Sequence, residues 1–335
     1  MGIIFTGGIT FGTGLAITEP PPAPVASYYV AISSFSNPRI NAYPWSGSGF
    51  GTKFADPATE PAGVGQGVAF SPSGDTIAVA HNVSPRISAY PWSASGFGTK
   101  FADPATLPGA DAYRVAFSPA GDAIAVTTDA TPFILVYPWS GSGFGTKYAD
   151  PATLPAFIAR GVAFSPAGDA IAVGHAFGAS ITAYPWSASG FGTKFADPAT
   201  MPAGLVNGID FSPAGDVIAM AVQGSPNITA YSWSGAGFGT KYADPATLPT
   251  GNGFGIDFSP AGDAIAVAHN NTPFVTAYPW SGSGFGTKFA DPATLPSGDS
   301  TGVAFSPAGD AIAVSYYAEP RVSAYPWSGS GFGTK

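Results

Sequence analysis

The sequence predicts an all-β protein, and three observations carry this prediction. The seven tryptophans recur at a constant spacing of 47 residues, from Trp45 to Trp327. Gly (45 residues) and Pro (34 residues) are abundant beside 14% aromatic residues, a composition that favours short strands joined by turns over helices. Each unit of 47 residues also holds four short apolar segments separated by turn residues. Four antiparallel strands in each of seven units are typical of a seven-bladed β-propeller.

The second unit illustrates the four strands, A to D, that we expect in each blade. Strand A covers residues 68–71, strand B 76–81, strand C 86–92, and strand D lies within 96–103. The turn Pro-Ser/Ala-Gly-Asp separates A from B, and Ser-Gly/Ala-Ser-Gly separates C from D. Strand B alternates Ile and Val on one face with Ala on the other. We therefore expect blades that are apolar on both faces, with the large Trp of one blade facing a small Ala of its neighbour.

A single propeller domain accounts for residues 1–335. Seven units use 329 residues and leave 6, which fall in a Pro-rich insertion near residues 19–29 of blade 1 (residues 14–60). The remaining blades occupy residues 61–335. Because the first and last residues continue the repeat into one another, we expect the ring to close near the termini in blade 7. Residues 331–335 would begin strand D of that blade, and the segment 1–13 would complete or flank it.

Two connections differ from unit to unit, while the A–B and C–D turns are nearly constant. The variable ones are the D–A and B–C connections. Successive turns of an antiparallel blade alternate between its two ends, so both variable connections are expected on one face of the disc. Relaxed selection would also vary loops, but it should alter the constant turns as well, and it would not favour arginine and aromatic residues. We therefore predict a recognition face. Its predicted residues are Arg39, Arg86, Tyr113, Arg114, Phe133, Phe157, Arg160, Phe177, Phe254, Phe274, Tyr316, Tyr317 and Arg321.

Chemistry-bearing residues are few. Asp210 and Asp257 replace the usual Ala of strand A in adjacent blades, which makes them candidate ligands for Ca²⁺ or Mg²⁺, although two carboxylates are too few to hold such an ion on their own. His81, His175 and His269 share one repeat position in alternate blades, too far apart for the ~2 Å bonds of a shared metal ion. We expect them to end strand B. No nucleophile–base–acid set is present, so the sequence predicts neither an enzyme nor a cofactor.

Charge and hydropathy limit the classes of partner. The net charge is −8 and no basic stripe is found, so nucleic acid is not an expected ligand. No apolar run approaches the ~20 residues of a membrane helix, so membrane insertion is not expected either.

The repeat resembles known propeller families. The run FSPAGDAIAVAH is similar to the FSPDG-type strand pair of WD-repeat propellers, and AYPWS stands where their WD dipeptide falls. The unit YPWSGSGFGTK followed by ADPATLP, and the Gly-rich start GGITFGTG, resemble virion proteins of tailed bacteriophages, including tail proteins with propeller repeats. The first resemblance implies the propeller fold, and the second implies a structural or adhesive role on a virus particle.

These observations predict a non-enzymatic binding or structural propeller on a virion or other extracellular surface. Its expected partners are a protein or glycan of a host surface, or other virion proteins, bound through the variable face. Two alternatives stay open, an intracellular protein–protein scaffold of WD-repeat type and a lectin-like glycan binder. A lectin should reuse the same pocket residues in every blade, whereas the candidate loops differ.

Overall fold

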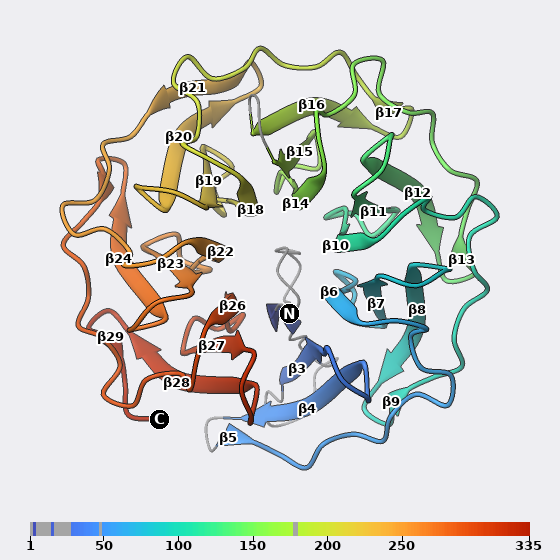
Figure 1. Ribbon diagram of the computed structural model, residues 1–335, viewed down its shortest axis with the longest axis horizontal. Coiled ribbons are helices and arrows are strands. Elements are labelled where there is room, and N and C mark those ends of the chain that lie inside the picture. The colour runs from blue at the N-terminus through green and yellow to red at the C-terminus, as the bar shows by residue number, and fades with distance from the viewer. Residues whose placement is uncertain (1–2, 5–14, 17–27, 47–48, 177–179) are drawn as a thin grey trace.

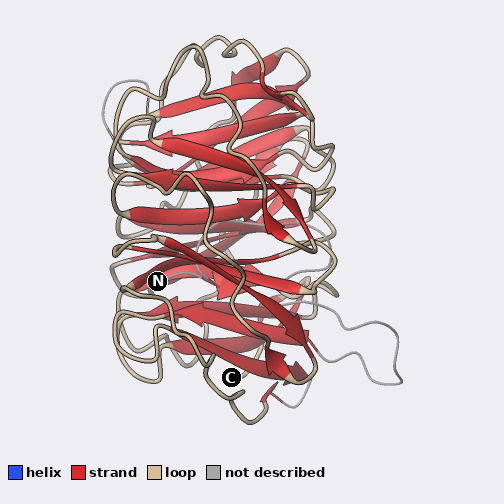
Figure 2. Cartoon of the chain, turned by 90° about the vertical axis from the view of Figure 1, so that its right-hand side faces the viewer, coloured by secondary structure: helices blue, strands red, loops and turns tan. Residues whose placement is uncertain are grey.

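Seven antiparallel blades, six described as four-stranded sheets and one as a five-stranded sheet, are arranged around a central channel in the computed structural model (Figure 1). The structure describes residues 3–4, 15–16, 28–46, 49–176 and 180–335. The seven-bladed β-propeller predicted from the spacing of the tryptophans is therefore confirmed. The described residues form strands, turns and loops without a helix, as the side view shows (Figure 2). None of them accordingly belongs to a helix of the length and apolarity that a membrane span requires.

The strands of each blade run from the channel to the rim in the order A to D. The innermost strands are β6 (Gly65–Phe70), β10 (Ala112–Phe117), β14 (Ala159–Phe164), β18 (Val206–Phe211), β22 (Gly253–Phe258) and β26 (Ser300–Phe305). The B strands are β3 (Tyr28–Ser33), β7 (Thr76–His81), β11 (Ala123–Thr128), β15 (Ala170–His175), β19 (Val217–Val222), β23 (Ala264–His269) and β27 (Ala311–Tyr316).

The outer half of each blade consists of strands C and D. The C strands are β4 (Ile40–Ser46), β8 (Ile87–Ser93), β12 (Ile134–Ser140), β16 (Ile181–Ser187), β20 (Ile228–Ser234), β24 (Val275–Ser281) and β28 (Val322–Ser328). The D strands are β5 (Gly49–Phe50), β9 (Gly96–Phe97), β13 (Gly143–Phe144), β17 (Gly190–Phe191), β21 (Gly237–Lys241), β25 (Gly284–Phe285) and β29 (Gly331–Phe332).

The ring closes between blade 7 and blade 1. Blade 7 takes all four of its strands, β26 to β29, from residues 300–332. The short strands β1 (Ile3–Ile4) and β2 (Leu15–Ala16) instead pair with β3 of blade 1 and also contact β26. Residues 3–4 thus flank blade 7 at its innermost strand and not at its outermost strand D. The Pro-rich insertion lies almost wholly outside the described residues.

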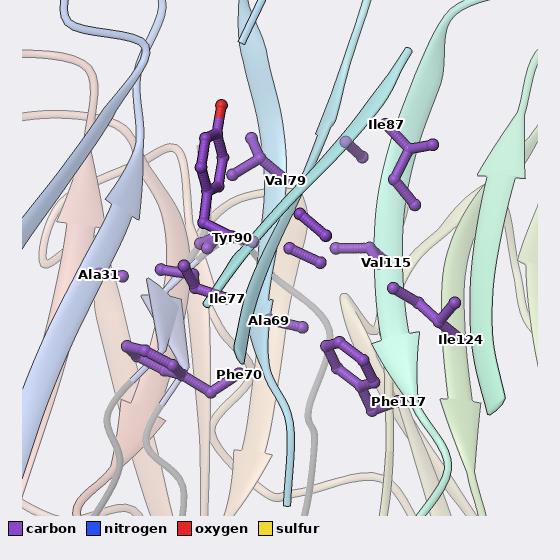
Figure 3. Close-up of a cluster of buried hydrophobic side chains, with 14 of the residues drawn as sticks. Ala31, Ala69, Phe70, Ile77, Val79, Ile87, Tyr90, Val115, Phe117 and Ile124 are labelled. Atoms are coloured by element: carbon purple, nitrogen blue, oxygen red, sulfur yellow. The ribbon is translucent and has the colours of Figure 1, made fainter. Parts of the chain in front are cut away.

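Each interface between blades joins a small face to a large face. In β6, Phe70 points to blade 1 and Ala69 points to blade 3 (Figure 3), and the alternation of side chains along the strand puts Val68 on the side of Phe70. Phe70 and Ile77 lie toward Ala31 of blade 1 on one side of the sheet, and Ala69 and Ile87 face Val115 and Phe117 of blade 3 on the other (Figure 3). These side chains are at most 1% exposed. At ~25 cal/mol per Å² of buried apolar area, this repeated interdigitation is the main source of stability.

The tryptophans lie in one cluster with small Ala residues of the neighbouring blade, as expected, and they also contact aromatic rings, which was not expected. Trp92 lies in the same cluster as the small residues of blade 1, but its ring meets other aromatic rings edge-to-face. Ring centroids lie 4.9 Å away for Phe97 of its own blade, 5.5 Å for Phe70 and 5.0 Å for Phe54 of the preceding blade. Such pairs add about 0.5–1.5 kcal/mol each beyond area burial.

Strand boundaries depart from expectation at both edges of the blade. Strand A begins three residues early, at Gly65, and strand D of blade 2 ends at Phe97 instead of continuing toward residue 103. Strand C contains a proline opposite strand D in six blades, and proline offers no N–H to a ladder. Blade 5 has Ser232 there, and its strand D, β21, extends over five residues. Proline therefore limits strand D elsewhere.

We expect Ser232→Pro to shorten β21 to two residues, because the substitution removes the one N–H that the other blades lack. Hydrogen exchange at the amides of residues 240–241 should then accelerate. The reciprocal change, Pro185→Ser, should slow exchange at residues 193–194 of blade 4. Unaltered exchange in both variants would show that proline does not set the length of this strand.

Candidate binding site at the channel mouth

The variable connections lie on one face, as the sequence predicts. Within a blade, the B–C turn is hydrogen-bonded to the D–A connection. The N–H of Asp129 donates to the carbonyl of Asp111 at 3.2 Å in blade 3, and the N–H of Gln223 donates to the carbonyl of Leu205 at 2.8 Å in blade 5. The same contact joins Tyr317 to Asp299 in blade 7 at 3.3 Å. Both variable connections therefore surround the same end of the channel.

One position of the repeat points toward this channel mouth from six blades. It is the second residue of strand A, and the pairing of strands A and B shifts register on either side of it in all six. Such β-bulges re-aim a side chain out of the regular alternation of a strand. The six residues are Gln66, Tyr113, Arg160, Asn207, Phe254 and Thr301, which are six different amino acids.

These six side chains share a depression of about 230 Å³ with residues of the neighbouring loops. Arg114, Leu205 and Gln223 contribute to its wall, and Phe35 and Tyr317 stack at its edge with ring centroids 5.1 Å apart. We call this depression the channel-mouth site.

Two guanidinium groups give the channel-mouth site its charge. Arg114 stands where five other blades have glycine, and its side chain is nine-tenths buried, at 8% exposure. Its Nη1 donates to the carbonyls of Gln66 and Tyr113, both at 3.0 Å. The guanidinium carbon of Arg160 lies 3.8 Å from the ring centroid of Tyr113, a cation–π contact.

The two arginines keep unused donors and have no carboxylate partner. The Nε atoms of Arg114 and Arg160 are buried without a hydrogen-bond partner, and neither side chain forms a salt bridge within the described residues. Burial, and next the charge of Arg160, lower the pKa of Arg114 to about 10, so it remains charged at neutral pH. Asp129 lies at the edge of the site, where it accepts a hydrogen bond from the Tyr113 hydroxyl at 3.5 Å. The site is therefore suited to bind a carboxylate or another anion.

Five residues of the predicted face thus lie together in the channel-mouth site. Five others share a different position of the repeat and lie outside this site. Tyr113, Arg114, Arg160, Phe254 and Tyr317 line the channel-mouth site. The other five follow the proline of the B–C turn, at a position whose backbone φ is positive in six blades. They are Arg39, Arg86, Phe133, Phe274 and Arg321. Arg86 donates to the carbonyl of Pro108 at 3.0 Å and Arg321 pairs with Glu319, so these two arginines make contacts within the protein.

The remaining predicted residues have separate environments. Phe157 is 43% exposed and does not line the channel-mouth site. Tyr316 is fully buried, and its hydroxyl lies 2.9 Å from that of Ser323. The prediction that Tyr316 belongs to the recognition face is therefore wrong, because its side chain lies inside the blade at the end of strand B. Phe177 lies outside the described residues.

Sequence reasoning missed the polar members of the site. Gln66, Asn207 and Thr301 were not predicted, because the recognition face was inferred from arginine and aromatic residues alone. Asn207 is nearly buried and its Nδ2 donates to the carbonyl of Gly253 in the next blade at 2.7 Å. Following the repeat position of Tyr113 in steps of 47 residues would have found all three.

Asp210 and Asp257 link neighbouring innermost strands. Oδ2 of Asp210 accepts the N–H of Phe258 at 2.7 Å, and Oδ2 of Asp257 accepts that of Phe305 at 2.6 Å. Burial raises the pKa of both carboxyls well above the ordinary value, and the charge of Asp257 raises that of Asp210 further. No third His, Asp or Glu joins them in the part of the chain that the structure describes. These contacts use Oδ2 of each carboxyl, while Oδ1 of each is buried without a hydrogen-bond partner among the described residues.

The paired carboxyls predict a pH dependence of stability. Because their folded-state pKa is raised above the unfolded value of about 3.9, they favour the folded state at low pH, and this contribution is lost as the pH rises. The double variant Asp210→Asn, Asp257→Asn should therefore gain stability relative to the parent between pH 4 and pH 8. Urea unfolding at both pH values measures this difference, and a difference independent of pH would contradict it.

The three histidines end strand B inside the blades. Their Nε2 atoms lie 3.1 Å from Ser88 Oγ for His81, 2.9 Å from Thr182 Oγ1 for His175 and 2.9 Å from Thr276 Oγ1 for His269. Each bond joins strand B to strand C across the blade. The expectation that these histidines end strand B is therefore confirmed.

Burial lowers the pKa of His81 and of His269 to about 4. An unfolded histidine titrates near 6.5, so each of these two residues costs stability as the pH falls from about 6.5 toward 4. His81→Thr, which places in blade 2 the residue that blade 3 carries as Thr128, should lessen the loss between pH 7 and pH 4.5 by on the order of 2 kcal/mol. Urea unfolding at the two pH values tests this, and equal losses in parent and variant would refute it.

Comparison with known proteins supports the fold. No family model and no curated protein matches the chain. Among solved structures, a chain in the crystal structure of the mitotic checkpoint complex is similar, with a TM-score of 0.63 and 15% identity over 96% of this chain and 87% of that one. At this identity the likeness supports the fold alone. Nothing in these comparisons supports the resemblance to bacteriophage tail proteins.

Proposed function

We propose that this chain is a non-enzymatic, protein-binding scaffold whose variable face receives an acidic segment of a partner protein. The observation that carries the proposal is the pair of guanidinium groups at the channel-mouth site. They come from adjacent blades, they have no carboxylate partner among the described residues, and the Nε of each is buried and unpaired. Burying such donors without acceptors is costly, and an incoming carboxylate would remove that cost.

The surroundings of the two arginines favour a polypeptide ligand. Aromatic rings and arginine are the residues enriched in the energetically dominant centres of protein interfaces, and Tyr113, Phe254 and Tyr317 lie beside Arg114 and Arg160. The site is positive on a chain whose net charge is −8, so attraction of an acidic segment is local and would orient the partner. The likeness to a chain of a protein complex is in keeping with such a role.

The other functions weighed from the sequence have less support. A virion or host-surface role depends on the repeat resemblance alone, and nothing in the comparisons favours it. A lectin with repeated sites would need the same residues in each blade, whereas the six inward-facing positions hold six different ones.

Binding of a labelled oligoglutamate peptide, followed by fluorescence anisotropy, tests the proposal. Arg114→Gly restores the residue of five other blades, and we expect it to weaken binding roughly tenfold or more, because a hydrogen bond to a charged group contributes ~1.5–3 kcal/mol. An oligoglutamine peptide should bind neither protein.

Arg321→Asn is the matched control. It removes one positive charge from the same face, but outside the channel-mouth site, and it introduces the residue that blade 5 carries as Asn227. It should weaken binding of the oligoglutamate peptide no more than about twofold. Equal losses in both variants would show a diffuse charge effect, and unchanged binding in Arg114→Gly would remove the site.

A further inference from the structure

An aromatic connector links each of six blades to the next one. After strand D the chain reads aromatic-Ala-Asp-Pro-Ala-Thr, and the aromatic ring packs edge-to-face on the Trp of the following blade. The ring centroids of these pairs lie 5.0–5.4 Å apart, from Phe54 with Trp92 to Phe289 with Trp327.

Two polar contacts fix the connector in place. The Asp of each connector pairs with the Lys three residues before it, as Asp103 does with Lys100. In five blades the strand C tyrosine of the next blade donates to the connector's Thr carbonyl, at 2.8 Å from Tyr90 to Thr59. The connector is therefore recognised by a tryptophan, a lysine and a tyrosine at repeated positions.

The seventh interface, between blades 7 and 1, holds a groove where the others hold a connector. The groove has a volume of about 450 Å³ and is lined by Tyr43, Trp45, Gly49 and Phe50 of blade 1 and by Val322 and Lys335 of blade 7, among others. Trp45, Tyr43 and Lys335 occupy the repeat positions of the recognising tryptophan, tyrosine and lysine. We call it the seam groove.

A glycine in the C–D turn lies next to the position of the connector's aromatic ring at each interface, so the space around this glycine shows whether a ring is present. A Cβ placed on this glycine would lie 3.0–3.3 Å from the connector's ring in six blades, for example 3.2 Å from Phe54 at Gly96. At Gly49 no described atom lies within 4 Å. Tyr43 is correspondingly half-buried, whereas its six equivalents are at most 1% exposed, and Phe50 reaches 36% exposure.

The amino-terminal segment does not supply the missing contacts with its described residues. Ile3–Ile4 would correspond to the Asp-Pro of a connector, but they pair with β3 and contact β26 at the channel. The six connectors of the chain itself are each engaged at their own interface.

We propose that the seam groove binds, from a separate polypeptide, an extended segment of the form aromatic-Ala-Asp-Pro-Ala-Thr. The aromatic ring lies on Trp45 beside Gly49, the Asp pairs with Lys335, and Tyr43 donates its hydroxyl to the Thr carbonyl. The groove is at the rim of the disc and uses none of the residues of the channel-mouth site.

Isothermal titration calorimetry with the synthetic peptide Phe-Ala-Asp-Pro-Ala-Thr-Leu-Pro, the sequence of residues 289–296, tests this. We expect saturable binding at one site per chain. Replacing the peptide's Phe by Ala should weaken binding at least about tenfold, through loss of a buried aromatic ring. Replacing its Asp by Asn should weaken binding about two- to fivefold, the range of an exposed ion pair.

Matched protein variants locate the binding. Lys335→Gln and Tyr43→Phe should each weaken binding two- to tenfold, whereas Lys288→Gln at an occupied interface and Arg114→Gly at the channel-mouth site should leave it unchanged. A photo-crosslinking phenylalanine analogue at the first peptide position should label residues 43–50 or 322–335. Absence of saturable binding, loss caused by Arg114→Gly, or labelling elsewhere would overturn the proposal. Because Arg114→Gly separates the two sites, failure here leaves the proposed function intact, and the reverse also holds.

Discussion

The packing of a small blade face against a large one is the constraint on which the rest of the structure depends. A blade has no solvated face, so both sides of every strand must find a partner of complementary size. Alternation within β6 and β7 supplies it, with Phe70 and Ile77 on one side and Ala69 and Ala78 on the other. Seven such contacts close the circle, and any enlargement of the small face would have to be absorbed by the whole ring.

This constraint divides the repeat into positions that must be uniform and positions that are free. The residues between blades and the turns that set the strands' spacing repeat almost without change. The bulged second residue of strand A escapes the requirement, because its side chain leaves the sheet and enters the channel mouth. Variation therefore collects where six blades converge. A uniform scaffold with one free inward position yields a single composite site instead of seven equal ones.

The sequence sufficed where periodicity and alternation determine structure, and it failed where one residue acts against them. The number of blades, strand B and the common face of the variable loops follow from the spacing of 47 residues and from antiparallel geometry. The length of strand D was overestimated, because a proline of strand C, such as Pro91, provides no N–H for the hydrogen bonds between strands C and D. Tyr316 was predicted to lie on the variable face because its sequence resembles that of the B–C loop, whereas it is the last residue of the buried strand β27. Arg114 and Arg160 line the same site because a β-bulge in strand A reorients side chains. The sequence pattern does not predict the position of this bulge or the direction in which it points a side chain.

The closed ring also explains why recognition can arise from the repeat itself. Each of six blades presents a tryptophan to the aromatic ring of the preceding connector, and five of them also donate a tyrosine hydroxyl to its Thr carbonyl. The connector's aspartate pairs with the lysine that directly precedes the connector. A ring of seven blades presents seven such acceptors, whereas residues 1–335 contain six connectors of this sequence. Trp45 and Tyr43 occupy the repeat positions that bind a connector at the other interfaces. At this interface the two residues line the seam groove. Affinity for that one sequence is then a consequence of how the fold holds its own blades together.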